Sequence, residues 1–360
     1  MSFFSFKETA IGLDISDYSI KAVYLKNTRQ GKIIKNLFEL AIPPGLINQG
    51  EIQNQDKLFE IFKEFLKKIK ASRIKTPYIV SSLPEEKSFI SVIQLPKMEE
   101  KEIGSALGFE IEANVPYAFQ EVYFDWKSLP SASLDHLDIL VAASPKKIVD
   151  SYFSLLKRLK LISVAFEIES QAIARALIKN EIQEKPILLI DLGATRTSFI
   201  IFSGGSIRFT SSIPVSSKDL TSAIADVLKI PENEAEILKI KHGLDKKGTE
   251  GIKIFDAILP RLTALIEKIQ NLIIFYQSHA KHEHGRILEF ENILLSGGGA
   301  NLAGLSQYLK EELKRKIGLG NPFVNLAKSP TKFLSDLAPD KAVAFTTAIG
   351  LALRNIETEI

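Results

Sequence analysis

The sequence contains two segments of the same design, one at the start of each half of the chain. An apolar strand over residues 10–15 carries Asp14 near its end, and a second apolar strand over 187–192 carries Asp191. Each segment continues through a tight turn into another strand. Such a repeat predicts two related lobes. Two rigid, part-buried carboxylates that face each other across a cleft could hold Mg²⁺, mostly through its water ligands.

A third element is a glycine triplet that follows a strand and precedes a helix. Glycines let the backbone pass close to a ligand, and a helix N-terminus favours an anion. Small and hydroxyl side chains near the two aspartates leave room for phosphate oxygens, and Lys21 adds a positive charge. Taken singly, each aspartate loop could be an ordinary hairpin with Asp as a turn residue. The order of the three elements favours a nucleotide site formed by Asp14, Ser16, Asp17, Ser19, Lys21, Asp191, Gly193, Thr195, Thr197, Gly297, Gly298 and Gly299.

The composition excludes several other classes of protein. The chain has no cysteine, which rules out disulfides, thiolate metal sites and cysteine nucleophiles and fits a reducing cytoplasm. No apolar run approaches the roughly 20 residues that span a bilayer. The net charge of +3 gives no reason to expect nucleic acid as a partner. A mildly basic surface remains compatible with a position near an anionic membrane.

The pattern of elements predicts three structural parts. Residues 1–84 form a first lobe that about 163–185 complete, and 186–360 form a second lobe with a helical subdomain at about 217–290. Between them, 85–162 has the order strand, helix, strand, strand, helix, which predicts a small inserted α+β subdomain. In the first lobe, a helix over 56–70 has one apolar and one lysine-rich face. The lysines form either a basic patch or an ordinary solvated surface.

The order of an Asp loop, an Asp-x-Gly loop and a Gly-Gly-Gly loop resembles that of the actin-like ATPases. This superfamily includes actin, the chaperone ATPases, sugar kinases and FtsA. The resemblance implies an α/β chain with the actin-like (ribonuclease-H-like) two-lobe fold, and ATP and Mg²⁺ as cofactors. By the same likeness Glu236 holds the ribose and Lys239 packs on the adenine. Glu169 orients the attacking water, or else is a helix-start carboxylate that the helix dipole favours.

Within the superfamily, the chain resembles the PilM family of type IV pilus assembly proteins most closely. Four stretches carry the likeness: residues 11–23, 110–125, 140–143, and 295–305 with 321–323. The resemblance implies a cytoplasmic ATP-binding scaffold at the inner-membrane face. It docks the N-terminal cytoplasmic peptide of a PilN-like inner-membrane protein in a groove between the first lobe and the inserted part. The implied protein meets the membrane only through partners, and self-association is left open.

The first loop departs from the family pattern. Ser16, Asp17 and Tyr18 stand where relatives typically have a Gly and small hydroxyl residues. Asp17 brings a second negative charge to the nucleotide site, which repels phosphate unless it points away or binds metal. Ser216 and Ser217 replace a usual Gly-Gly pair, and Arg196 lies in the second loop. We therefore expect hydrolysis to be weak or absent.

Two alternative functions remain. An FtsA-like filament-forming division protein would carry a C-terminal membrane helix after a linker, whereas residues 354–360 are short and acidic. A sugar-kinase-like enzyme would need a catalytic base in a substrate pocket, and the sequence offers no residue for that role.

Overall fold

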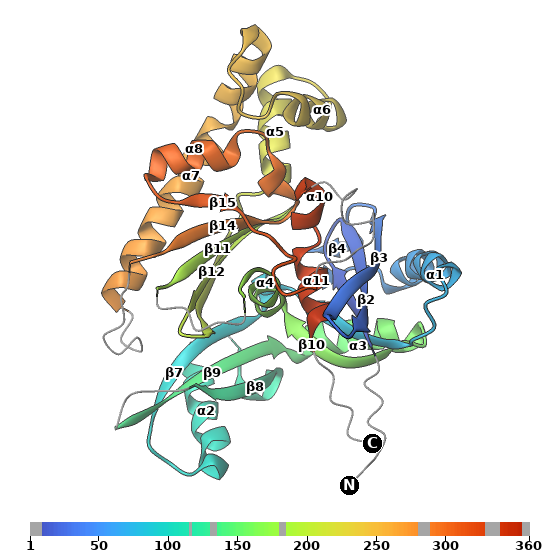
Figure 1. The fold of residues 1–360 in the computed structure, drawn as a ribbon, viewed down its shortest axis with the longest axis vertical. Helices are drawn as coiled ribbons and strands as arrows, with labels where there is room; N and C mark the ends of the chain where they lie inside the picture. The colour runs from blue at the N-terminus through green and yellow to red at the C-terminus, as the bar shows by residue number, and fades with distance from the viewer. Residues whose placement is uncertain are drawn as a thin grey trace.

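The computed structural model describes residues 9–114, 117–129, 135–179, 185–279, 289–327 and 339–354. Residues 115–116 of the PilM-like stretch and the C-terminal residues 355–360 lie outside them. Figure 1 shows the two large sheets side by side, with a group of helices above the second one. Two sheets with helices packed on them form the two-lobe α/β architecture expected from the three loops.

The first sheet has the strand order β10-β6-β1-β2-β3. The hairpin of β1 and β2 is antiparallel, whereas β1, β6 and β10 run parallel, so their C-terminal ends meet at one edge. This sheet consists of β1 (Ile11–Ile15), β2 (Ser19–Thr28), β3 (Gly31–Ala41), β6 (Tyr78–Leu83) and β10 (Ile162–Ile168). A short ladder of β4 (Ile47–Asn48) and β5 (Glu51–Ile52) lies outside it.

Helices cover both faces of the first sheet. On one face, α1 (Gln55–Ala71) and α3 (Lys146–Arg158) share a core with β1, β2 and β6. On the other face, α4 (Glu169–Leu177) and α11 (Thr346–Leu353) pack against β1, β2 and β6. Gly350 allows this pair to pack closely, since a Cβ there would lie 1.8 Å from the carbonyl oxygen of Ala172.

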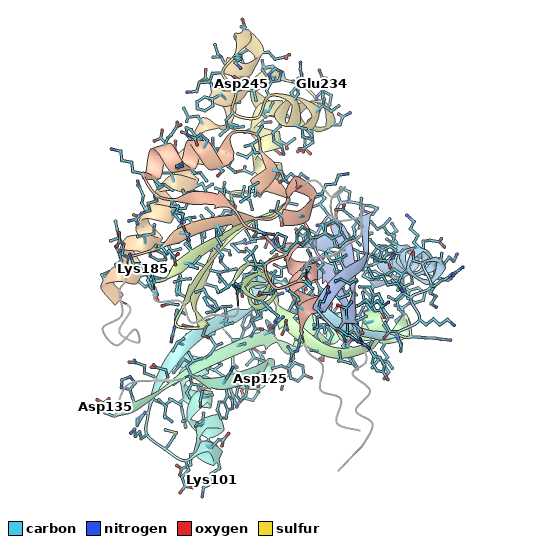
Figure 2. All side chains as sticks on the ribbon, in the orientation of Figure 1. Lys101, Asp125, Asp135, Lys185, Glu234 and Asp245 are labelled. Atoms are coloured by element: carbon cyan, nitrogen blue, oxygen red, sulfur yellow. The ribbon has the colours of Figure 1, made fainter. Side chains whose placement is uncertain are left out.

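The second sheet has the order β15-β14-β11-β12-β13-β7-β9-β8. Its first part consists of β11 (Ile187–Leu192), β12 (Thr197–Ser203), β13 (Ser206–Ile213), β14 (Asn292–Ser296) and β15 (Ile317–Leu319). One face packs on α4, and the other packs on α5 (Ser217–Leu228), α7 (Gly248–His279) and α8 (Leu305–Leu313). Three helices rise above the sheet: α5, α6 (Glu232–His242) and part of α7. Figure 2 places Glu234 and Asp245 at the tip of this group.

The inserted part extends this second sheet. Its strands β7 (Phe89–Pro96), β9 (His136–Pro145) and β8 (Val122–Leu129) join β13 through the register pair Phe209 and Ser91, and α2 (Glu100–Asn114) packs on them. Figure 2 places Lys101 and Asp135 at its far end. The remaining short helices are η1 (Glu85–Lys87), η2 (Phe119–Glu121), η4 (Gly298–Asn301) and α10 (Pro339–Val343).

The packing differs from the expected boundary of the inserted subdomain at 85–162. The second expected helix, α3, places Tyr152, Leu155 and Leu156 against Phe62 and Phe65 of the first lobe. Among the described residues, the core of β7–β9 contains no side chain of α3, which meets β8 and β9 only at its margin. The Tyr152 hydroxyl also donates to the carbonyl of residue 50 at 2.9 Å. Burial of this apolar stripe fixes the helix to the first lobe, so we propose residues 88–145 as the inserted subdomain.

Candidate functional site

An open cleft lies where the two lobes meet, with about 980 Å³ of space up to its mouth. It is formed at the C-terminal ends of β1 and β11, the usual place for a ligand site in α/β sheets. Twelve of the residues expected at a nucleotide site line this cleft. They are Asp14, Ser16, Asp17, Ser19, Lys21, Glu169, Asp191, Gly193, Thr195, Gly297, Gly298 and Gly299.

Asp14 is held at the cleft floor by both neighbouring strands. The β1–β2 register sets it opposite Lys21, and the Ser82 hydroxyl at the end of β6 donates to its Oδ1 at 3.1 Å. Burial raises the pKa of Asp14, although Lys21 and Ser82 both act in the opposite direction. Lys21 in turn donates to the Ser19 hydroxyl at 2.9 Å. The pair therefore places a carboxylate and an ammonium group side by side at the cleft floor.

Asp17 serves the loop rather than a ligand. Its Oδ2 accepts the backbone N–H of Gln49 at 3.0 Å, and its Oδ1 accepts that of Gly50 at 2.9 Å. Both carboxylate oxygens are thus used, and the side chain is 7% exposed. The two N–H dipoles stabilise the charge of the Asp17 carboxylate, which reduces its repulsion of a phosphate in the cleft. Its expected role in nucleotide binding is corrected to one in holding the 49–50 turn against the first loop.

Asp191 occupies the matching position in the second lobe. The Ser296 hydroxyl at the end of β14 donates to its Oδ1 at 2.7 Å, the same arrangement as Ser82 with Asp14. Burial, with a smaller contribution from the charge of Asp14, raises the pKa of Asp191 to about 6. That contribution requires the two carboxyl groups to lie near each other across the cleft.

The glycine loop passes directly over Asp191. Gly297 has φ +82°, and a Cβ there would lie 2.4 Å from the Leu192 carbonyl oxygen and 3.0 Å from Asp191 Oδ1. Only glycine satisfies both conditions without displacing the backbone. A Cβ at Gly298 would meet nothing within 4 Å, so the loop faces open space there. The backbone of this loop is thus exposed to whatever fills the cleft.

The hydroxyl residues of the second loop separate into two groups. Thr195 lines the cleft, whereas Thr197 is fully buried and donates to the Val215 carbonyl at 2.6 Å. The expectation that Thr197 contacts a ligand is therefore corrected, because its side chain ties β12 to the segment before α5. Ser216 caps α5 by accepting the Asp219 N–H at 3.1 Å.

Glu169 begins α4 inside the cleft. Burial, together with the charges of Asp14, Glu86 and Asp191, raises its pKa well above the ordinary value. Glu86, which the sequence analysis missed, also lines the cleft, and burial raises its pKa as well. A signal was available, because Pro84-Glu85-Glu86 follows an apolar strand as each aspartate does. The cleft therefore collects carboxyl groups that stay protonated more readily than usual.

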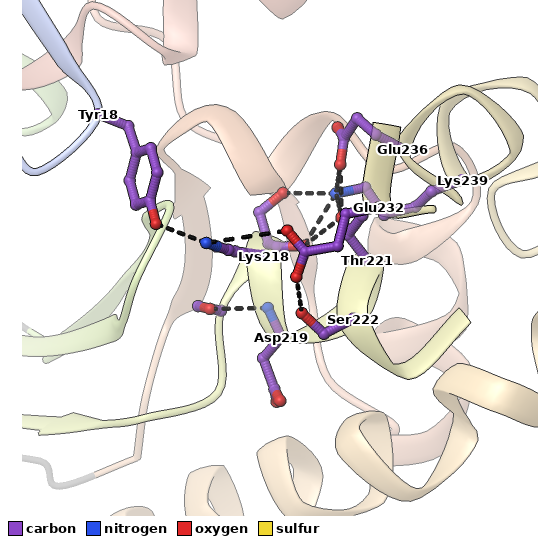
Figure 3. Close-up of polar contacts among 10 residues, drawn as sticks. Tyr18, Lys218, Asp219, Thr221, Ser222, Glu232, Glu236 and Lys239 are labelled. Carbon is purple, nitrogen blue, oxygen red and sulfur yellow. Dashed lines mark hydrogen bonds and ion pairs between the residues drawn. The ribbon is translucent and has the colours of Figure 1, made fainter. Parts of the chain in front are cut away.

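Glu236 and Lys239 lie beside the cleft rather than in its lining. They form the network in Figure 3, in which Lys239 Nζ contacts Glu236 at 2.7 Å and donates to the Thr221 hydroxyl at 2.7 Å and the carbonyl of Ser217 at 2.8 Å. Lys239 is 4% exposed, and burial lowers its pKa. Glu236 lines a second cavity of about 720 Å³, which shares Ala194 and Ser217 with the cleft.

One contact joins the two lobes across the mouth of this second cavity. The Lys218 ammonium, on α5, donates to the Tyr18 hydroxyl of the first loop at 2.7 Å and lies 5.0 Å from the centre of its ring (Figure 3). It also lies 3.9 Å from Glu232. Sequence reasoning missed this pair, since 200 positions separate its members.

The donor set suits a cation held through water. Among the described residues, no group of three or more His, Asp and Glu side chains is arranged to ligate a metal directly. Asp14 and Asp191 still supply two facing carboxylates, a number that fits Mg²⁺, which keeps several of its waters.

No helix in the described part of the chain is long and apolar enough to cross a membrane.

Comparison with known proteins agrees with this geometry. The family model of "Type IV pilus assembly protein PilM" matches residues 12–356. The solved PilM–PilN type IV pilus biogenesis complex contains a chain that is 27% identical, with a TM-score of 0.85 over 98% of this chain and 100% of that one. MreB5 of Spiroplasma citri bound to ADP is 13% identical, with a TM-score of 0.54 over 89% of this chain and 94% of that one. That likeness extends to the fold alone.

Among sequence relatives, the cell division protein FtsA of Buchnera aphidicola is 26% identical over 174 residues, which cover 42% of this chain and 41% of FtsA. The chain thus spans less than half the length of this curated relative, and FtsA is a distant one. The family model spans nearly the whole chain, so this chain belongs to the PilM family of type IV pilus assembly proteins.

Proposed function

We propose that this chain binds ATP with Mg²⁺ and acts as a scaffold of the type IV pilus inner-membrane platform, docking the N-terminal cytoplasmic peptide of a PilN-like protein. The observation that carries the proposal is the whole-length structural match to the PilM–PilN complex. The FtsA-like alternative has weaker support, because the matched region covers less than half of each chain. A sugar-kinase-like enzyme has no support from the comparisons above.

The nucleotide part of the proposal assigns a role to each side of the cleft. Asp14 and Asp191 hold Mg²⁺ through its waters, while Lys21 and the backbone near Gly193 and Thr195 meet the phosphates. The exposed backbone at Gly298 faces the adenosine. Glu236 then meets the ribose through the adjoining cavity. Lys239, expected to pack on the adenine, is buried and lies outside the lining of this cavity, so its role is to hold Glu236 in place.

Slow or absent hydrolysis is supported by the state of Glu169. A group that orients an attacking water must accept its proton. Burial and the neighbouring charges raise the pKa of Glu169 well above the ordinary value, which disfavours the ionised form that accepts a proton from water. ATP therefore acts mainly as a ligand that holds the two lobes together.

The peptide docks where α3 of the first lobe meets the inserted subdomain. There β8 is the outermost strand of its sheet, so one of its edges can pair with an added strand. Two large apolar side chains are exposed beside it, Tyr123 on β8 at 48% and Phe153 on α3 at 46%. The Tyr123 hydroxyl contacts Asp150 of α3 at 3.2 Å, which joins the two elements.

Titration calorimetry with a synthetic N-terminal peptide of the PilN-like protein, in the presence of ATP and Mg²⁺, tests the partner. We expect micromolar or tighter binding and at least a tenfold loss in Phe153→Ala, since truncating a buried aromatic anchor typically costs more than 1 kcal/mol. Ile274→Ala, which truncates an exposed apolar side chain on α7 far from this strand edge, is the control. Absence of peptide binding by the native chain would refute the scaffold role.

A further inference from the structure

Positive charge is concentrated in two neighbouring segments of the first lobe. Residues 55–75, which contain α1, and 146–160, which contain α3, together hold twelve Lys and Arg but four Asp and Glu, a formal charge of +8. The whole chain has a formal charge of +3, so all other residues together carry −5. The small net charge of the whole chain therefore does not show how unevenly the charge is distributed. It makes one side of the first lobe strongly basic.

Each acidic side chain of these segments already has a partner. Asp56 pairs with Arg158 at 2.8 Å, Glu60 with Lys63 at 3.4 Å, and Glu64 with Lys67 at 2.6 Å. Asp150 accepts from the Tyr123 hydroxyl. Seven exposed cations of these segments are in no ion pair in the described part of the chain. Lys57 lies in the first turn of α1, and we call the other six the basic face: Lys68, Lys70, Arg73, Lys75, Lys157 and Lys160.

The topology brings these six residues to one edge of the five-stranded sheet. Short connections lead from α1 into β6 and from α3 into β10, and β6 and β10 are parallel neighbours. The C-terminal ends of both helices therefore lie at the edge where these strands begin. The Ile162 N–H donates to the Pro77 carbonyl at 2.9 Å, which fixes the two connections together. Figure 1 shows α1 far from the helices α5 and α6 of the second lobe.

We propose that the basic face rests directly on the surface of an anionic membrane. Clusters of four to eight Lys and Arg bind anionic lipid headgroups, and each adds favourable energy near such a surface. An exposed aliphatic side chain, Ile162 at 47%, lies among the cations next to Lys160. An apolar side chain can enter the headgroup boundary of a bilayer, whereas a nucleic-acid backbone offers it no partner. This contact goes beyond attachment through a membrane partner alone.

Vesicle flotation of the full chain without nucleotide or peptide tests this contact separately from the proposed function. Vesicles of phosphatidylcholine with 40% phosphatidylglycerol should retain the chain at 50 mM salt and release it at 500 mM, whereas pure phosphatidylcholine should not retain it. The test variant loses three positive charges and keeps helix-compatible side chains. It carries Lys68→Gln, Lys75→Gln and Lys157→Gln.

The matched control loses three exposed lysines of the second lobe and has the same net charge. It carries Lys253→Gln, Lys310→Gln and Lys316→Gln. We expect the test variant to lose at least tenfold in apparent affinity for the anionic vesicles and the control to lose less than threefold. Equal losses in both variants, or no binding of the native chain to anionic vesicles at 50 mM salt, would overturn the proposal. Circular dichroism of both variants verifies that they are folded.

Discussion

Replacing Asp191 by Asn should stabilise the ligand-free protein at alkaline pH. Burial raises the pKa of Asp191 from 3.8 to about 6, so the folded chain holds a proton there that the unfolded chain releases. Between these two values the unfolding free energy falls as pH rises, and above about pH 7 the loss is complete. Each pKa unit corresponds to about 1.4 kcal/mol, so the full loss is about 3 kcal/mol.

The substitution removes the charge but keeps the hydrogen bond. The Asn amide oxygen can accept from the Ser296 hydroxyl as Asp191 Oδ1 does. Urea denaturation in chelator should therefore show Asp191→Asn more stable than the native chain by about 3 kcal/mol at pH 8 and by about half of that at pH 5. Asp256→Asn, an exposed position on α7, should change neither value.

Mg²⁺ and ATP should reverse this order. A ligand that binds only the folded state stabilises it, by about 2.7 kcal/mol at a hundred times Kd. Because the ionised carboxylate is the form that attracts the cation, the native chain should gain this stabilisation and the variant should not. A variant that is less stable than the native chain at pH 8, or a difference that does not grow from pH 5 to pH 8, would refute the raised pKa. Equal gains with Mg²⁺ and ATP would refute the role of Asp191.

Three other substitutions test separate parts of the site. Lys218→Met removes the contact with Tyr18 that joins the two lobes at the second cavity, so a fluorescent ADP should dissociate several-fold faster in stopped flow. An unchanged rate would show that the contact does not retain nucleotide. Gly297→Val should cost several kcal/mol in denaturation experiments, because its Cβ would lie 2.4 Å from the Leu192 carbonyl oxygen, whereas Gly298→Ala has free space and should cost less than about 1 kcal/mol. Lys239→Met removes the buried cation that donates to Thr221 and Ser217 and should destabilise the chain by about 2 kcal/mol. A loss below about 1 kcal/mol would contradict the proposed importance of this network.

The sequence was informative where function depends on local pattern. An aspartate at the end of an apolar strand, or a glycine triplet between a strand and a helix, is visible within ten residues. Their order along the chain then identified the fold, and the structure brings Asp14, Asp191 and Gly297 into one cleft. The conformation at Gly297 follows from the same local pattern, because a left-handed backbone next to a carbonyl requires glycine.

Features that depend on distant partners could not be read in this way. Asp17 lies beside the site in sequence, but its role comes from backbone N–H groups 32 and 33 positions away. Thr197 has the right residue type in the right loop, yet its hydroxyl is used by Val215. The helix α3 follows the inserted strands directly and still packs on Phe62 and Phe65, because its apolar stripe matches the first lobe. Adjacency in sequence does not determine which of two cores a helix joins.

The first lobe separates two opposite charge distributions by the length of its strands. The carboxyl groups of the cleft lie at the C-terminal edge of β1, β6 and β10, and the basic face lies at the edge where β6 and β10 begin. A strand of six residues spans about 20 Å, roughly twice the Debye length at physiological salt. The negative surface potential of a membrane in contact with the basic face is therefore largely screened before it reaches Asp14, Glu169 and Asp191. Contact with lipid at one edge and nucleotide binding at the other are thus electrostatically independent, and a chain resting on its basic face leaves the cleft edge directed away from the membrane.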